Sequence, residues 1–240
     1  MGQRRLLSKL HAGIRPFLQA LRDHPWRVHF LFRAQLPLQR RPQYDTTTIA
    51  LRYALDKWAA SRRTALEIGI GEAALLSIYL ALIHGLGVDG IDISAKRVSM
   101  SREVISVNQA SFRVWESDLF DRVDGKYDLI FFNPPYVPTA VGRDLSLTRR
   151  GDFDSNRVWD GGPDGTDVIR SFLAEVPVHL TDDGVVLVGA QGFYIPREKM
   201  CRLVERNGLR VLCVKKRFAN PSLVWVLGMA EAPLVKSQAC

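Results

Sequence analysis

Residues 64–230 alternate between two patterns of hydrophobic and polar positions. Short apolar runs bounded by glycine, asparagine or aspartate predict strands, and apolar residues three and four positions apart predict helices. The expected strands are 64–70, 87–94, 112–117, 127–133, 184–190, 210–219 and 222–230, and the expected helices are 72–85, 95–109, 164–180 and 197–208. Strands separated by helices of this length predict crossover connections and a mostly parallel sheet.

The last two expected strands follow a different rule. Asn220-Pro221 stands between them and is a turn signal, so we expect an antiparallel pair. Together the seven strands predict an α/β fold, a doubly wound, Rossmann-like and mostly parallel sheet.

The first part of the chain reads as helical. Apolar residues recur at helical spacing over 4–22, and a second helix is expected over 46–60. The aromatic and basic segment between them is broken by prolines and has no clear pattern. We therefore expect a basic helical extension at 1–45 and one catalytic or binding domain at 46–240.

Positive charge is concentrated near the start of the chain. Residues 1–63 contain 13 Lys and Arg but three Asp and Glu, whereas the remainder contains 20 and 22. Such an excess suggests an acidic partner, for example RNA, a ribosome or an anionic surface. A basic helix with a solvated polar face explains the same charge equally well.

Composition excludes several classes of protein. No apolar run approaches the length of a membrane span, so we expect no membrane association. The cysteines at 201, 213 and 240 lack CxxC spacing, which argues against a disulfide scaffold or a metal site and suits the reducing cytoplasm. The Arg-rich, amphipathic start also has features of a mitochondrial transit peptide, although serine is sparse, and organelle targeting stays open.

A glycine-containing turn follows the first expected strand. In LEIGIGEA, Gly69 and Gly71 permit a tight turn and a close approach of the backbone to a ligand. The helix N-terminus beyond them favours a negative group such as a carboxylate. Ala73 replaces the third glycine of the dinucleotide-binding pattern, so the turn alone is a weak signal.

Acidic residues follow the next two strands. Asp92 lies about 20 residues beyond the glycine turn, the spacing of a ribose-hydroxyl acceptor, and Asp118 follows the third strand. Each could instead cap a helix or a turn, a role that Ser94 could share with Asp92. Ligands of open parallel sheets bind outside the carboxyl ends of the strands, so the three strand ends together predict a cofactor site.

The fourth strand, YDLIFF, delivers Asn133-Pro134-Pro135-Tyr136 to the same edge. The Asn133 side chain and the Pro134 carbonyl, held in direction by the proline rings, offer two acceptors. They can hold both hydrogens of an amino or amide NH₂ group and turn the nitrogen lone pair towards an electrophile. Tyr136 can stack on a planar substrate. A strand-ending turn without chemistry is the alternative, which the neighbouring acidic strand ends disfavour.

The order LEIGIGEA, GIDIS, SDLFD and YDLIFFNPPYVP resembles the class I S-adenosylmethionine-dependent methyltransferases with the Asn-Pro-Pro-Tyr signature. That signature is typical of enzymes that methylate nitrogen on adenine, guanine or glutamine amides. The stretch VWDGGPDGTDVIRSFL further resembles HemK-type protein glutamine methyltransferases, in which Gly-Gly-x-x-Gly opens the helix before the fifth strand. The resemblance covers roughly residues 44–230.

This resemblance implies S-adenosylmethionine as the cofactor. The residues that it assigns to the cofactor are Thr48, Glu67, Gly69, Gly71, Asp92, Asp118, Leu119 and Asn133, and those that it assigns to the substrate nitrogen are Asn133, Pro134, Pro135 and Tyr136. Glu67 and the two glycines would line the methionine end of the cofactor. Asp92 would accept the ribose hydroxyls and Asp118 the adenine amino group.

The substrate is less well specified. A macromolecule, either a protein glutamine or a nucleic-acid base, suits the basic extension and is the main hypothesis. A small-molecule N-methyltransferase stays open, because only residues 1–45 precede the core where bacterial release-factor enzymes carry a larger helical domain. A non-catalytic scaffold is the third hypothesis, and it disagrees with the intact tetrapeptide. We interpret the polar loop at 139–160 as a substrate-recognition segment, and the pattern indicates no oligomeric state.

Overall fold

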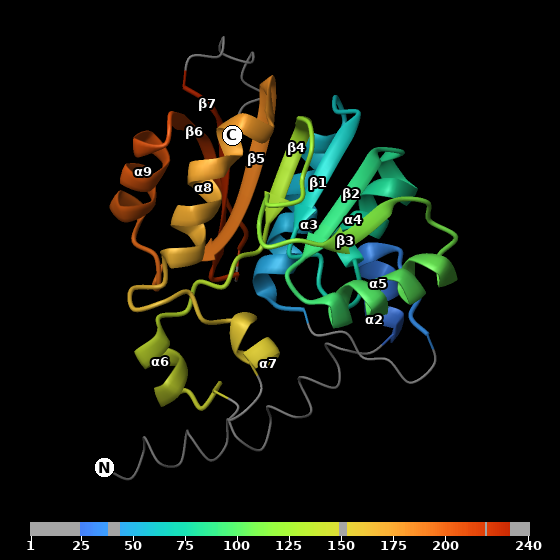
Figure 1. The fold of residues 1–240 in the computed structure, drawn as a ribbon, viewed down its shortest axis with the longest axis horizontal. Helices are drawn as coiled ribbons and strands as arrows, with labels where there is room; N and C mark the ends of the chain where they lie inside the picture. Colours follow the sequence, from blue (N-terminus) through green and yellow to red (C-terminus); the bar gives the residue numbers. More distant parts are fainter. Residues whose placement is uncertain (1–24, 38–43, 149–152, 219, 231–240) are drawn as a thin grey trace.

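The computed structural model describes residues 25–37, 44–148, 153–218 and 220–230 (Figure 1). Within this part of the chain, one sheet contains β1 (Thr64–Ile68), β2 (Gly87–Asp92), β3 (Arg113–Glu116), β4 (Tyr127–Phe132), β5 (Leu180–Gln191), β6 (Leu209–Lys216) and β7 (Ser222–Met229). The strand order is β3-β2-β1-β4-β5-β7-β6, and β7 runs antiparallel to both of its neighbours. The expected doubly wound, mostly parallel sheet of seven strands is confirmed.

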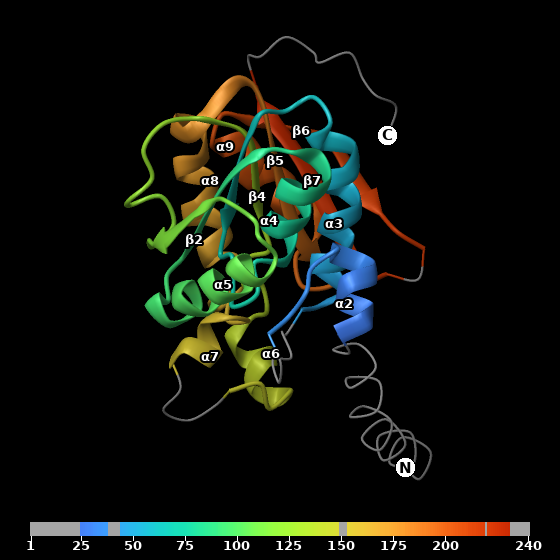
Figure 2. The same ribbon diagram turned by 90° about the vertical axis from the view of Figure 1, so that its right-hand side faces the viewer.

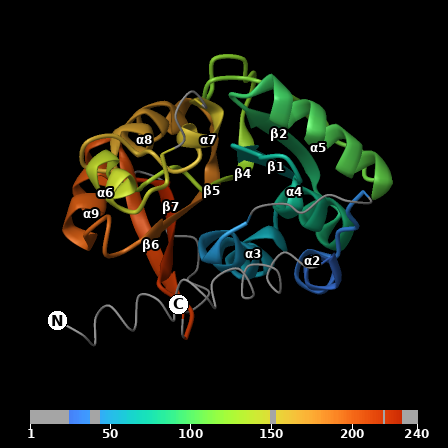
Figure 3. The same cartoon turned by 90° about the horizontal axis from the view of Figure 1, so that it is seen from below.

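The helices that the structure describes cover both faces of this sheet. They are α2 (Pro25–Phe32), α3 (Thr46–Ala59), α4 (Leu75–Tyr79), the π-helix η1 (Leu80–His84), α5 (Ala95–Val107), α6 (Thr139–Asp144), α7 (Phe153–Arg157), α8 (Asp167–His179) and α9 (Arg197–Arg206). Buried hydrophobic side chains form two core clusters. The first includes side chains from α2, α3, α4 and α5, and the second includes side chains from α8 and α9. Figure 3 shows α3 and α8 on opposite sides of the sheet.

Central strands are buried on both faces, as their continuous apolar runs require. In β4, Leu129 and Phe131 point into the first core cluster, whereas Ile130 and Phe132 point into the second. All four side chains are buried. The alternation sets the register of β4, because a slip by one residue would exchange the two sets of side chains.

Four segments differ from the pattern-based expectations. The helix expected over 72–85 begins at Leu75 and ends as the π-helix η1. The loop expected over 139–160 contains α6 and α7, and the strand expected over 184–190 extends from Leu180 to Gln191. The unassigned segment before residue 45 contains α2. The helix expected over 4–22 lies outside the described residues.

Helix α2 packs on the domain rather than standing apart from it. Val28 and Phe32 are fully buried, and the Phe32 ring meets Tyr44 edge-on at 5.3 Å between centroids. Arg52 of α3 donates through Nε to the Leu31 carbonyl at 2.8 Å. Figure 2 shows α2 next to α3 in the same layer. The boundary at residue 45 stays a prediction, but this contact ties residues before it to the core.

The start of α4 depends on a side chain from the sheet. Its N-cap residue, Ala74, has a left-handed backbone with φ of 49° and offers no capping oxygen. The buried Glu67 carboxylate of β1 instead accepts from the backbone N–H and the hydroxyl of Ser77, at 3.1 and 2.5 Å. Glu67 thereby satisfies a donor of the first helical turn that would otherwise lack a partner.

None of the helices in the described ranges is both long and apolar enough to cross a membrane.

The packing of α2 generates a first prediction. Phe32→Ala should lower the free energy of unfolding by about 3 to 5 kcal/mol, because it leaves a cavity in a filled core. Phe30 on the same helix is 65% exposed, so Phe30→Ala is the matched control and should change stability by less than about 0.5 kcal/mol. Urea denaturation of both variants measures the difference. Equal losses would contradict the anchoring of α2 by Phe32.

A second prediction follows from Glu67. Burial raises the pKa of its carboxyl from 4.5 to about 8, opposed by the hydrogen bonds from Ser77 and reinforced by the charge of Asp92. The folded state therefore holds the Glu67 proton more tightly than the unfolded chain does. The resulting contribution to the free energy of unfolding is complete below pH 4.5 and is lost as the pH rises to about 8. Glu67→Gln cannot ionise, and its Tm should fall less between pH 5 and pH 8 than that of the natural protein. Thermal melts across this range test the effect, which parallel curves for the two proteins would refute.

Candidate active site

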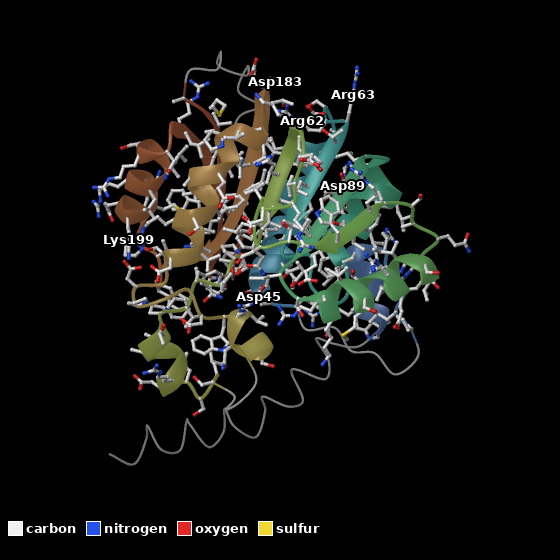
Figure 4. The ribbon with its side chains drawn as sticks, viewed as in Figure 1. Asp45, Arg62, Arg63, Asp89, Asp183 and Lys199 are labelled. Carbon is white, nitrogen blue, oxygen red and sulfur yellow. The ribbon has the colours of Figure 1, made fainter. Side chains whose placement is uncertain are left out.

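The candidate site lies where the strand order reverses, between β1 and β4. Ile68 and Phe132 are paired in the parallel ladder, so Gly69 and Asn133 leave the sheet side by side. Figure 4 shows Asp45 at this carboxyl edge, whereas Arg62, Arg63 and Asp183 lie at the opposite edge. A reversal of strand order opens a crevice between neighbouring connections, which is the usual ligand site of such sheets.

The glycine turn has the backbone that its sequence predicted. Gly69 and Gly71 have φ of 66° and 67°, values that residues with a side chain rarely adopt. A Cβ atom at Gly69 would approach Phe132 to 3.1 Å, whereas a Cβ atom at Gly71 would meet nothing within 4 Å. The turn is therefore closed against the sheet at Gly69 and open at Gly71.

Asp92 holds this turn in place. Its Oδ2 accepts from the Gly71 N–H at 3.0 Å, and its Oδ1 accepts from the Ser94 N–H at 3.0 Å. Arg97 approaches Oδ1 at 3.6 Å. Ser94 is the N-cap residue of α5, without a side-chain cap bond, so Asp92 does not cap this helix, and its ribose contact stays a prediction.

Asp118 and Leu119 follow the adjacent strand. Asp92 pairs with Glu116, so Asp118 comes from the neighbouring strand end, where its side chain is exposed. Leu119 has φ of 43°, and its carbonyl accepts from the Ser117 hydroxyl at 2.9 Å. By contrast, the Glu67 carboxylate is directed to Ser77. The cofactor roles of all these residues stay predictions.

Asn133 meets residues from the start of α3. Its Nδ2 donates to Asp45 Oδ1 at 3.1 Å and to Thr48 Oγ1 at 3.2 Å. Its Oδ1 is buried and has no hydrogen-bond partner among the described residues. Thr48 therefore lies beside Asn133, its cofactor contact stays a prediction, and Asn133 Oδ1 is an unsatisfied acceptor within the described residues.

Tyr136 is held by the same helix terminus. Its hydroxyl donates to Asp45 Oδ2 at 3.2 Å and shares a hydrogen bond of 2.7 Å with Thr47. Burial and the Asp45 charge raise the pKa of Tyr136 well above its ordinary value. The side chain is 6% exposed, and its ring lies 6.1 Å from that of Tyr194, centroid to centroid. Tyr136 is thus a neutral, anchored phenol, and its stacking on a substrate stays a prediction.

The Gly-Gly-x-x-Gly stretch, residues 161–165, contacts the backbone at the end of the Asn-Pro-Pro-Tyr corner. Val137 donates to the Trp159 carbonyl and accepts from the Gly161 N–H, both at 2.9 Å. A Cβ atom would approach Tyr136 Cα to 2.8 Å if placed at Gly161, and the Tyr136 carbonyl oxygen to 2.5 Å if placed at Gly165. Glycine is needed at both positions because two stretches of backbone lie in direct contact.

Helices α6 and α7 occupy the segment that was interpreted as a recognition loop. Figure 1 shows both beyond the carboxyl edge of the sheet. A Cβ atom at Gly142 of α6 would overlap the Trp159 ring, so α6 is packed closely on the stretch that follows α7. The role of this segment in substrate recognition stays a prediction.

Sequence reasoning missed several residues of the site. Asp45 was assigned to the N-terminal extension, yet it is the N-cap residue of α3 and contacts Asn133 and Tyr136. Thr47 and Ser222 were not assigned, although they extend the Tyr136 network to β7 with a hydrogen bond of 2.9 Å. An aspartate followed by three threonines at a helix start is a capping signal that could have pointed to Asp45.

Comparison with known proteins finds methyltransferases with similar sequences. The model of the methyltransferase small domain matches residues 40–148. A Methanocaldococcus jannaschii protein, provisionally named a protein N5-glutamine methyltransferase, is 36% identical over 126 residues, 52% of this chain and 60% of that protein. The release factor glutamine methyltransferase of Geobacter sulfurreducens is 28% identical over 148 residues, 61% of this chain and 51% of that enzyme. The ribosomal protein uL3 glutamine methyltransferase of Bradyrhizobium diazoefficiens is 35% identical over 129 residues, 52% of this chain and 39% of that enzyme.

The chain spans less than two thirds of the length of each of these relatives. Among solved structures, a methyltransferase from Pyrococcus furiosus superposes with a TM-score of 0.66 over 90% of this chain and 98% of that one. At 19% identity this similarity concerns the fold. The matched methyltransferase small domain, the motifs and the sheet order agree, and the chain resembles the class I S-adenosylmethionine-dependent methyltransferases, in particular their HemK-type protein glutamine methyltransferases.

Proposed function

We propose that this chain transfers a methyl group from S-adenosylmethionine to the side-chain amide nitrogen of a glutamine in a protein. One observation carries the proposal. Within the part of the chain that the structure describes, the Asn133 Oδ1 atom is a buried acceptor without a donor, at the corner where the two central strands end. A substrate N–H would supply the missing hydrogen bond, and an unsatisfied buried acceptor is costly in the absence of such a partner.

The strand ends beside this atom suit the cofactor. The turn is open at Gly71, where an added Cβ atom would meet nothing within 4 Å, and Asp92 stands beside it with its Oδ2 bound to the Gly71 N–H. Gly69, Gly71 and Asp92 would hold the cofactor along the ends of β1 and β2, and the exposed Asp118 would reach its adenine. When bound, S-adenosylmethionine supplies an electrophilic methyl carbon on a positively charged sulfur.

The protein residues orient the nitrogen rather than deprotonate it. Asn133 Oδ1 and the Pro134 carbonyl would each accept one N–H, which fixes the plane of the amide and directs the nitrogen lone pair. Tyr136 does not serve as a base near neutral pH, because the pKa of its hydroxyl is raised by burial and by Asp45. The nitrogen would form the new bond to the methyl carbon while the bond from that carbon to sulfur breaks, with the electron pair left on the neutral thioether, and it would lose one hydrogen as a proton to solvent.

A protein amide is favoured by the similar enzymes. The Geobacter and Bradyrhizobium relatives act on glutamine in a release factor and in ribosomal protein uL3, as their names state. The basic segment at the start of the chain suits a partner associated with RNA. We place the reaction in the cytoplasm, with a protein of the translation machinery as the partner.

The substrate class is open to direct measurement. Tritium transfer from labelled S-adenosylmethionine into a fractionated cell extract should place the label in protein, with no loss on ribonuclease treatment. Release of methylated glutamine after complete proteolysis would identify the amide. Label in RNA, with transfer that falls steeply as salt rises, would instead identify a nucleic-acid base. Label in the small-molecule fraction would identify a small-molecule enzyme.

Asn133 provides the mutational prediction. Asn133→Ala should lower the turnover number by about 10²-fold or more, because it removes an oriented hydrogen-bond acceptor from the reacting nitrogen. Its Kd for S-adenosylmethionine, measured by calorimetry, should change by less than about threefold. Asn207, the C-cap residue of α9, likewise donates a side-chain N–H, in its case to the Leu203 carbonyl, so Asn207→Ala is the matched control and should keep full turnover.

Two results would contradict the proposal. Full activity in the Asn133→Ala variant would remove this residue from the mechanism. A natural protein that gives no heat with S-adenosylmethionine and transfers no label would be a methyltransferase-fold scaffold.

A further inference from the structure

Asp45 makes more hydrogen bonds to the site than helix capping requires. Its Oδ1 accepts from the Thr48 N–H at 2.8 Å, from the Thr48 hydroxyl at 2.9 Å and from Asn133 Nδ2 at 3.1 Å. Its Oδ2 accepts from the Tyr136 hydroxyl at 3.2 Å. A single carboxylate therefore contacts both ends of the Asn-Pro-Pro-Tyr corner from a helix that is 88 residues away in sequence.

These contacts set the orientation of the Asn133 amide. A carboxylate has acceptors only, so the amide group that faces Asp45 must be the NH₂. Thr48 gives its hydroxyl hydrogen to Asp45 and so can only accept from Asn133, at 3.2 Å. Both neighbours thus require the same orientation. In the opposite orientation Asn133 Oδ1 would face two acceptors.

The orientation decides what the site offers a substrate. With the NH₂ held by Asp45 and Thr48, the free atom of Asn133 is the buried acceptor Oδ1. An acceptor at this position binds a nitrogen that carries hydrogens. It repels a group with acceptors only, such as the carboxylate of a glutamate, because neither partner supplies a hydrogen.

We propose that Asp45 is a positioning residue that acts through Asn133 and makes the corner selective for an NH₂ group over a carboxylate. The inference rests on the proposed function, because it concerns the same reacting nitrogen. Asp45 touches neither the substrate nor the cofactor in this mechanism. It determines which atom of Asn133 does so.

The helix start offers a substitution that separates positioning from capping. Serine is about as good an N-cap residue as aspartate, so Asp45→Ser should keep the start of α3. Its short side chain carries one oxygen, which the cap bond occupies, and it does not reach Asn133. Without Asp45 the Thr48 hydroxyl is also free to donate, so both orientations of Asn133 become accessible. Asp45→Asn is the matched variant, because its carbonyl oxygen can still accept where Oδ1 does.

The first readout is kinetic. With tritiated S-adenosylmethionine and proteins from ribonuclease-treated extract of cells that lack this chain, Asp45→Ser should lower the turnover number by about 10- to 100-fold. Its Kd for S-adenosylmethionine should stay within about twofold and its Tm within a few degrees. Asp45→Asn should keep turnover within about threefold. Unchanged turnover in Asp45→Ser, or a loss matched by equal losses in cofactor affinity and Tm, would overturn the inference.

The second readout needs no activity. The side-chain NH₂ signal of Asn133 in ¹⁵N NMR can be assigned from its absence in Asn133→Ala. Its hydrogens should exchange with solvent at least about tenfold faster in Asp45→Ser than in the natural protein, with little change in Asp45→Asn. Equal exchange in all three proteins would refute the orientation by Asp45 even if methyl transfer is observed. Absence of methyl transfer by the natural protein, with the exchange difference present, would instead refute the proposed function and leave the geometry intact.

Discussion

The parallel pairing of β1 with β4 is the constraint on which the site depends. These two strands are adjacent in the sheet although β2 and β3 separate them in sequence, and Ile68 lies opposite Phe132 in their ladder. The glycine turn and the Asn-Pro-Pro-Tyr corner therefore begin at the same level of the sheet. Side chains on both faces of β4 are buried in separate core clusters, which makes a shift of register costly.

The corner is held from two directions by segments remote in sequence. Asp45 and Thr47 at the start of α3 bind its side chains, whereas the glycines of 159–165 pack on its backbone. Each support has a different physical basis, one in charge-assisted hydrogen bonds and the other in close backbone approach. The Asn133 side chain is thereby held in one orientation, the kind of preorganisation on which electrostatic catalysis depends.

The order of strands and helices was largely predictable from the sequence. Runs such as 127–133 are buried on both faces and end at prolines, so local composition and tertiary environment agree. The start of α4 was missed because Ala74 occupies the N-cap position and the capping acceptor is the Glu67 side chain of β1. The short helix α6 was missed because its packing on Trp159, through Gly142, outweighs the local propensity of a polar segment.

By itself the sequence determined the residue types at the sheet edge: two glycines that permit a tight turn, an aspartate after each of two strands, and an asparagine before two prolines. Each of these is a local requirement of backbone geometry, so a short stretch suffices to show it. The tertiary structure alone decided that Asp45 belongs to the site and that Asn133 presents its oxygen. That assignment depends on a hydrogen bond across 88 residues, and no local pattern specifies which side chains meet when a sheet brings distant segments together.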